Sequence, residues 1–235
     1  MIYLRPANER GNANFGWLNS KHSFSFGSYY DPRHMGFSTL RVINDDSVIG
    51  GAGFDTHGHR NMEIISYVLA GAIEHRDSLN NRYVIPAGDV QVMSAGTGIT
   101  HSEYNHSSDQ VLKFLQIWIL PNRQNVQPRY EQMSINQLGE VTPLVSEDGA
   151  GGTLKIHANA RISRIELGAD KKLSLSLDGR AGYLHVISGN ALLAEHSLSA
   201  GDAVGLVEEP VEIQSGSSGL IGLWFDLPAP DFAGS

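Results

Sequence analysis

Short apolar segments separated by turn residues run along almost the whole chain, and this spacing limits the fold more than any other feature. The segments are rich in valine, isoleucine, leucine and aromatic residues, and 26 glycines punctuate the chain. Many short strands with turn signals between them are typical of a sandwich or barrel, so the chain is predicted to be all-β. Helical periodicity is weak, and the best candidate for a short helix is Ser134–Leu138. Examples of the apolar segments are residues 64–69, 90–93, 111–120, 184–187, 203–207 and 220–225.

A polar stretch that carries two prolines, residues 121–132, suits a linker between domains. The sequence weakly repeats itself on either side of this stretch. Tyr67–Gly71 resembles His185–Gly189, and Pro86–Asp89 resembles Ser199–Asp202, in the same order. These matches predict two similar β-domains in tandem, residues 1–130 and residues 131–235.

The composition excludes several classes of function. The formal net charge is −8 and no cluster of lysine and arginine stands out, so direct nucleic-acid binding is not expected. There is no cysteine, which excludes disulfides, thiolate metal sites and cysteine nucleophiles. The first residues lack the apolar core of a secretory signal, and no apolar run approaches the length of a membrane span, so the cytoplasm is the expected compartment.

Two glycine-bordered segments each carry a pair of metal-ligand side chains: His57 and His59 in one, His101 and Glu103 in the other. Residues i and i+2 of a strand point to the same face, so two such pairs on neighbouring strands would bring four ligands together. Three imidazoles and one carboxylate suit a first-row divalent ion such as Fe, Ni, Co, Cu or Mn. Zinc is compatible, although four protein ligands on zinc more often make a closed structural site. An octahedral ion would keep two positions open for water, O2 or substrate.

The first of these segments resembles the first motif of the cupin superfamily, G(X)5HXH(X)3,4E(X)6G. The last glycine of the motif, Gly71 here, falls one residue beyond the usual spacing. The second cupin motif, G(X)5PXG(X)2H(X)3N, is represented with a longer spacer between its two parts. The matching residues are Gly51, His57, His59, Glu63 and Gly71 for the first motif, and Pro86, Gly88, His101 and Asn105 for the second.

Within the cupins, the chain resembles the pirin family, and in particular bacterial members of the quercetin 2,3-dioxygenase type. The segments that carry this resemblance are residues 24–32, 35–44, 57–63 and 94–103. The resemblance covers the whole chain, is strongest over residues 1–130 and is faint after residue 150. Gly58 stands where pirins usually have proline, which loosens the loop but removes no ligand.

The pirin resemblance implies a bicupin, with two tandem antiparallel β-barrel (jelly-roll) domains and one iron site. Its ligands fall on His57, His59, His101 and Glu103; Fe(II) is the expected ion, with Ni, Co, Cu, Mn or Zn as alternatives. In many cupins the glutamate of the first motif is the ligand, here Glu63, but in pirins the carboxylate comes from the second motif. Glu63 is therefore expected beside the site. No HxH or HxE pair follows residue 130, so the C-terminal domain is predicted to lack a metal site, with isolated histidines at positions 157, 185 and 196.

The function implied by the resemblance is a metal-dependent dioxygenase that opens the ring of a flavonol such as quercetin with O2 and releases CO. Glu103 would then have a second role, as the catalytic base that accepts the proton of the substrate's 3-hydroxyl group. The expected partners are a small aromatic substrate and O2. The alternative is a non-enzymatic, metal-containing pirin-type regulator that acts through protein partners, and an isomerase is a third candidate because the cupin fold hosts many chemistries.

Other residues have two interpretations each. His22 and His34 either cover the metal pocket or are ordinary hydrogen-bonded loop residues, and the second interpretation is favoured. His75 and His106 are expected to be exposed, and Asp45-Asp46 is most simply a solvated turn. An aromatic group in the N-terminal segment either lines a substrate pocket or, more often for such groups, packs in the core. Its members are Trp17, Phe24, Phe26, Tyr29 and Tyr30.

Overall fold

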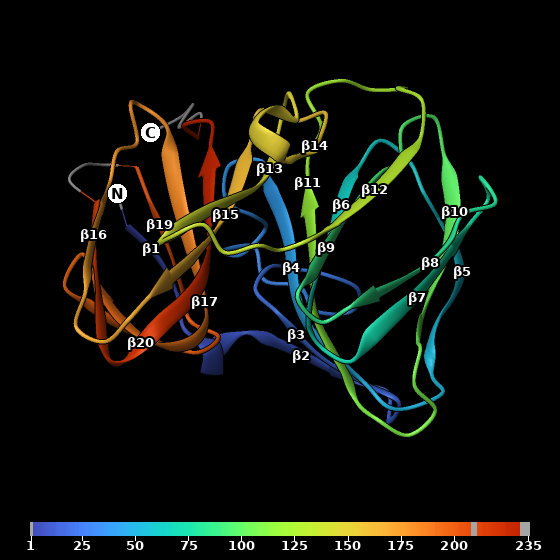
Figure 1. Ribbon diagram of the computed structural model, residues 1–235, viewed down its shortest axis with the longest axis horizontal. Coiled ribbons are helices and arrows are strands. Elements are labelled where there is room, and N and C mark those ends of the chain that lie inside the picture. Colours follow the sequence, from blue (N-terminus) through green and yellow to red (C-terminus); the bar gives the residue numbers. More distant parts are fainter. Residues whose placement is uncertain (1, 208–210, 231–235) are drawn as a thin grey trace.

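The structure is a computed structural model that describes residues 2–207 and 211–230. Strands dominate the described residues, and helix there is limited to two 3-10 turns, η1 (Ala7–Glu9) and η2 (Ala150–Gly152). Two β-rich halves lie side by side, each jelly-roll-like and formed from open sheets (Figure 1). The prediction of an all-β bicupin is therefore confirmed, with open sheets in place of closed barrels. Within the described part of the chain, no helix is long and apolar enough to cross a membrane.

Two sheets make up the N-terminal half. The larger contains, in spatial order, β12 (Arg129–Ser134), β9 (Asp89–Ser94), β6 (Glu63–Ala70), β11 (Leu112–Ile119), β4 (Leu40–Val48), β3 (Leu18–His22) and β2 (Gly11–Asn14). The smaller contains β5 (Gly53–His59), β10 (Ile99–Asn105), β7 (Ala72–Asp77) and β8 (Arg82–Pro86).

Both faces of the larger sheet are buried. Along β6, Val68 packs against Ile73 and Ile85 of the smaller sheet, whereas Ile65 and Tyr67 belong to the core cluster shared with the C-terminal half. Residues 63–68 of β6 are all buried for this reason, and the strand accordingly has a nearly continuous apolar sequence. The C-terminal half thus covers the back of the sheet whose front faces the smaller sheet.

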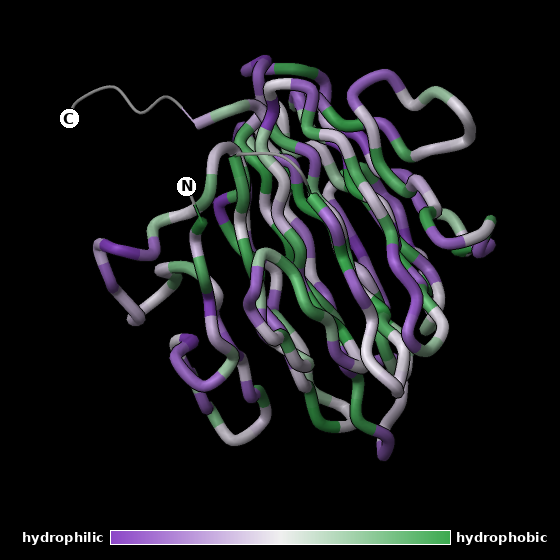
Figure 2. The backbone as a smooth tube through the Cα atoms, turned by 90° about the vertical axis from the view of Figure 1, so that its left-hand side faces the viewer, coloured by the Kyte–Doolittle hydropathy of each residue, from purple (hydrophilic) through white to green (hydrophobic). Residues whose placement is uncertain are grey.

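The C-terminal half is built on one large sheet, and its strands alternate between hydrophilic and hydrophobic residues along much of their length (Figure 2). Its pairings are antiparallel apart from β13 with β14, which run parallel. The strands are β13 (Val141–Ser146), β14 (Leu154–Lys155), β15 (Arg161–Leu167), β16 (Lys172–Leu175), β17 (Ala181–Leu193), β18 (His196–Ser199), β19 (Ala203–Leu206) and β20 (Val211–Leu227).

The chain crosses between the two halves near its start and again near its middle. The first strand, β1 (Ile2–Arg5), pairs with β19 and so belongs to the C-terminal sheet (Figure 1). Conversely, β12 pairs with β9 in the N-terminal half. Residues 135–138 continue from β12 as irregular chain, so the short helix expected at Ser134–Leu138 is wrong. The division into residues 1–130 and 131–235 stays a prediction.

The weak internal repeat corresponds to a repeated piece of backbone. Gly71 and Gly189 both have φ of 76°, and Gly88 and Gly201 both have φ of 87°. The amide of Gly88 donates to the carbonyl of Val68, and the amide of Gly201 donates to the carbonyl of Val186. The four glycines allow left-handed turns that other residues rarely adopt, which explains why these positions stand out in both halves.

Candidate metal centre

Three of the four predicted ligands come together on the paired strands β5 and β10. His57 lies directly opposite His101 in the antiparallel register, and His59 lies opposite Ile99. One nitrogen from each of His57, His59 and His101 can be chosen so that all three lie within 4.8 Å of one another. The ring centroids of the three imidazoles are between 4.5 and 4.9 Å apart. The i, i+2 spacing on β5 and the cross-strand pairing with β10 produce this convergence.

The nitrogen atoms of this three-histidine group fit a divalent ion. Within residues 2–207 and 211–230, His59 Nε2 and both ring nitrogens of His101 are buried without a hydrogen-bond partner. His57 Nδ1 donates to the backbone oxygen of Asp55 at 2.7 Å, which leaves its Nε2 free as a ligand. Burial and the neighbouring imidazoles lower the pKa of His59 to about 4. Burial lowers the pKa of His101 to about 4 as well, although the charge of Glu103 acts to raise it. Both rings are therefore neutral at pH 7, the form that binds metal.

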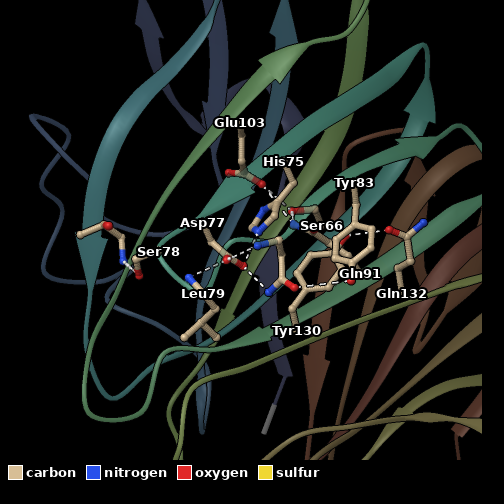
Figure 3. A network of polar contacts seen from close by, with 12 residues as sticks. Ser66, His75, Asp77, Ser78, Leu79, Tyr83, Gln91, Glu103, Tyr130 and Gln132 are labelled. Atoms are coloured by element: carbon tan, nitrogen blue, oxygen red, sulfur yellow. Dashed lines mark hydrogen bonds and ion pairs between the residues drawn. The ribbon is translucent and has the colours of Figure 1, made fainter.

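Glu103 is buried beside this group, at a bulge of β10. The register of β10 against β5 shifts between His101 and Glu103, and Glu103 is not among the residues within the 4.8 Å group. Its carboxylate is held by donors from the larger sheet. Oε1 accepts from Ser66 at 3.0 Å and from Gln91 at 3.2 Å (Figure 3). Oε2 accepts from Gln116 at 2.7 Å.

The charge state of Glu103 follows from these contacts. Burial acts to raise its pKa, but His101, His75 and the hydrogen bonds from Ser66 and Gln116 outweigh burial, so the pKa is lowered. The carboxylate is ionised at neutral pH. Because an ionised carboxylate offers about four lone-pair directions, three donors leave about one free, on Oε2. The roles of Glu103 as ligand and as catalytic base stay predictions.

A buried histidine–aspartate pair lies behind the centre. His75 is opposite Glu103 in the register of β7 and β10, and its ring centroid is 5.4 Å from that of His101. His75 Nε2 bonds Asp77 Oδ2 at 3.0 Å, and both side chains are 0% exposed (Figure 3). The expectation that His75 is exposed is wrong. Its alternation with the buried Ile73 along β7 is the sequence signal that would have placed it inside.

A cavity of about 360 Å³ adjoins the three-histidine group, with His57 and His59 in its wall. Its apolar surface is aromatic, and its polar surface comes from inward-facing residues of β3, β4 and β11. The aromatic residues are Phe15, Trp17, Phe26, Phe54 and Trp118, and the polar ones are Ser20, His22, Asn44, Asp46 and Gln116. Such a concave, mostly apolar space with a few polar groups suits a small flat ligand.

The lining of the cavity shows which histidines and aromatic residues of the N-terminal segment face the site and which lie elsewhere. His22 lines it, whereas His34 lies elsewhere and bonds the Tyr3 hydroxyl at 2.6 Å. Trp17 and Phe26 line the cavity, Phe24 packs in the core between the halves, and Tyr30 is 72% exposed.

Asp46 also lines the cavity, although the sequence alone did not mark it as a candidate site residue. Asp45 and Asp46 lie within β4, and Asp46 is 2% exposed, so the interpretation of this pair as a solvated turn is wrong. The physical reason is that β4 is a nine-residue strand whose inward positions include Asn44, Asp46 and Val48. Without the strand's bounds, two adjacent aspartates carry no sign of which one points inward.

Glu63 faces away from the three-histidine group. Its Oε2 accepts from the Ser94 hydroxyl at 2.6 Å, and the backbone of His157 and the charge of Arg129 act on it as well. These neighbours lie at the interface with the C-terminal half. The expectation that Glu63 lies beside the site is wrong, because Glu63 begins a new strand, β6, and a break in the strand after β5 removes any shared strand face with His57 and His59.

The described part of the C-terminal half contributes no residue to the three-histidine group. His185 is 1% exposed, and burial lowers its pKa to about 3, so it is a neutral core residue. His157 lies on a loop and His196 on β18, and neither belongs to the three-histidine group.

Fold and site together define a bicupin whose first half carries a histidine group suited to a divalent metal. Residues 4–119 match the family described as Pirin, and residues 143–227 match a quercetinase C-terminal cupin domain. The chain is 46% identical over 230 residues to quercetin 2,3-dioxygenase of Escherichia coli strain K12, covering 97% of this chain and 99% of that protein. The chain belongs to the pirin family.

Two solved structures show how closely the fold is shared. YhhW from Escherichia coli matches with a TM-score of 0.95 at 45% identity, covering 98% of this chain and 99% of that one. The bacterial pirin YhhW in complex with nickel(II) matches with a TM-score of 0.92 at 45% identity, covering 98% and 100%. A divalent ion is thus bound in a relative of the same fold.

Proposed function

We propose that the protein is a metal-dependent dioxygenase of the quercetin 2,3-dioxygenase type. The observation that carries this proposal is the three-histidine group with unpartnered buried nitrogens, opening onto an aromatic cavity. The 46% identity to a named quercetin 2,3-dioxygenase over almost the whole chain supports the same class of enzyme. The proposed reaction is opening of a flavonol ring by O2 with release of CO.

His57, His59 and His101 would hold the ion, with Glu103 as the fourth ligand through Oε2. Fe(II) is our first candidate for the native ion, and Ni, Co, Cu, Mn and Zn are the alternatives. When bound, a divalent ion would supply Lewis acidity toward the hydroxyl and carbonyl oxygens of a flavonol, together with redox chemistry toward O2 if the ion is redox-active.

The residues of the chain orient the substrate and manage one proton. Trp17, Phe26 and Trp118 provide flat apolar walls that hold an aromatic ring system and exclude water. Glu103 would also serve as the base: since only about one lone pair is free, on Oε2, the ionised carboxylate would release the ion to accept the proton of the substrate's 3-hydroxyl group there. Ser66, Gln91 and Gln116 fix the carboxylate's orientation during this transfer.

The test is aerobic turnover of quercetin by protein loaded separately with each candidate ion. Loss of the flavonol's near-visible absorbance should be accompanied by equimolar O2 uptake and CO release. His101→Ala should abolish the reaction, whereas His106→Ala, at a 52%-exposed side chain, should leave it unchanged. No turnover with any divalent ion would reject the dioxygenase and favour the regulator.

A further inference from the structure

We propose that Asp46 binds a phenolic hydroxyl group of the substrate and so determines its specificity. The proposal deepens the proposed function, because it takes a flat hydroxylated aromatic compound as the occupant of the cavity. It assigns a role to a buried carboxyl group that neither the three-histidine group nor Glu103 requires.

The position of Asp46 is the first argument. It lies near the C-terminal end of β4, in the wall of the cavity that also contains His57 and His59. Its neighbours in register are Ser20 of β3 and Phe114 of β11. One layer further along the same strands lie His22, Asn44 and Gln116. The polar surface of the cavity is therefore concentrated on one side, as a strip formed by three adjacent strands.

The missing partner of Asp46 is the second argument. Oδ1 of Asp46 is buried and has no hydrogen-bond partner among the residues that the structure describes. The other members of the strip already have partners: His22 Nδ1 bonds Asn44 Oδ1 at 2.7 Å, and Gln116 donates to Glu103. A buried carboxyl oxygen without a partner costs free energy, and structures keep such groups mainly where a ligand or water completes them.

The electrostatic surroundings of Asp46 disfavour an anion and suit a hydroxyl ligand. Burial raises the pKa of Asp46 to about 7, although the hydrogen bond from Ser20 acts to lower it. The charged groups that act on Asp46 are the carboxylates of Glu103 and Asp45, which raise its pKa further. Near neutral pH the carboxyl group is thus present in both forms. A phenolic hydroxyl serves either form, because it donates to a carboxylate and accepts from a carboxylic acid.

A hydrogen bond between Asp46 and a substrate hydroxyl group predicts selectivity among flavonols. Flavonols share the hydroxy-ketone unit expected at the metal, and they differ in the hydroxyl groups of their two outer rings. A site built to bond a hydroxyl group rejects an analogue that lacks it, since the polar group of the protein then stays unpaired. Quercetin, with hydroxyls on both outer rings, should therefore bind more tightly than 3-hydroxyflavone, which has none.

The experiment measures binding of these two flavonols by quenching of tryptophan fluorescence. Trp17 and Trp118 lie in the cavity wall, so a bound flavonol should quench their fluorescence whether or not it is converted. Asp46→Ala should weaken quercetin binding by about 10- to 100-fold, the range for a hydrogen bond to a charged group. The same variant should change 3-hydroxyflavone binding by less than about threefold. Asp46→Asn, which keeps the shape and one acceptor, should lie between wild type and Asp46→Ala.

The matched control is Asp45→Asn, the adjacent residue on the opposite face of β4, where it pairs with Arg10 at 3.4 Å. It should leave the affinities for both flavonols unchanged. Equal losses for both flavonols in Asp46→Ala, or no loss for either, would overturn the role of Asp46, as would a wild type that binds neither. A wild-type protein that binds quercetin selectively through Asp46 but consumes no O2 would overturn the proposed dioxygenase alone.

Discussion

Mild acid should displace a metal ion from this protein far less readily than from exposed histidines. Protons and metal compete for the same imidazole nitrogens, so affinity falls as pH drops through the pKa of each ligand. Burial lowers the pKa of His59 and of His101 to about 4. A lowered pKa means that the neutral, metal-binding form persists to lower pH, and loss of affinity through these two residues should begin only below about pH 5.

The size of the effect follows from the two pKa values. At pH 5, two imidazoles with an ordinary pKa of about 6.5 would weaken the apparent affinity by about 1000-fold. With a pKa of about 4 for each of His59 and His101, the combined loss at pH 5 is only about 1.2-fold. The two cases differ by nearly three orders of magnitude.

Equilibrium dialysis against Ni(II) between pH 7 and pH 4.5 measures this difference. The slope of log Kd against pH counts the protons that the metal displaces. Between pH 6 and pH 5 we expect a slope of no more than about one, which corresponds to one displaced proton. A slope of two or three in this range would refute the reasoning. Trp118→Ala provides the comparison, because the indole packs edge-on at 5.1 Å from the ring of His59. Exposing His59 in this way should raise its pKa and steepen the slope.

Three further predictions follow from buried groups and backbone conformation. His185 has its pKa lowered to about 3 by burial, so the unfolded chain takes up a proton below pH 6.5 that the folded chain does not. Through this residue, the free energy of unfolding should then fall by about 2 kcal/mol between pH 7.5 and pH 5. Urea titrations at the two pH values should show that His185→Leu and His185→Gln both lack this contribution. Glu103→Gln should weaken Ni(II) binding by about 10- to 100-fold in the same dialysis assay, because it removes the charge while keeping the shape; unchanged affinity would argue against ligation. Gly189→Ala should destabilise the protein more than Gly71→Ala in urea, because a Cβ at Gly189 would overlap the backbone oxygen of Gly219, whereas at Gly71 the nearest atoms are 3.2 Å away. The left-handed conformation alone should cost each variant about 1–2 kcal/mol, so equal losses would contradict the role assigned to the overlap.

The histidines could be predicted from sequence because the information that places them is local. His57 and His59 share a strand face by their spacing alone, and His101 belongs to a second segment with the same spacing. The internal repeat is local as well, since Gly71 and Gly189 mark the same left-handed turn.

The environment of the site could not be predicted in this way, because it depends on which strands become neighbours. The alternation with Ile73 indicates that His75 points inward, but its place beside Glu103 depends on the pairing of β7 with β10, which nothing near His75 in the sequence states. Glu63 points away from the cavity because the chain breaks between β5 and β6, which removes any relation of strand face to His59. The pairing of β1 with β19 joins residues about 200 positions apart, which no local pattern encodes.

The role of the C-terminal half follows from the same strands that carry the site. On β4, Asn44 faces the cavity, while the adjacent Ile43 is 0% exposed in the core cluster that also contains Ile162 and Phe225 of the C-terminal half. On β11, Gln116 likewise lies between Leu115 and Ile117, which belong to the same core cluster. Because a slip of one residue along β4 would exchange these faces, the apolar contacts with the C-terminal half fix the register in which Asn44 and Asp46 point inward. A half that carries none of the three histidines thereby helps to position the cavity in which we place the substrate.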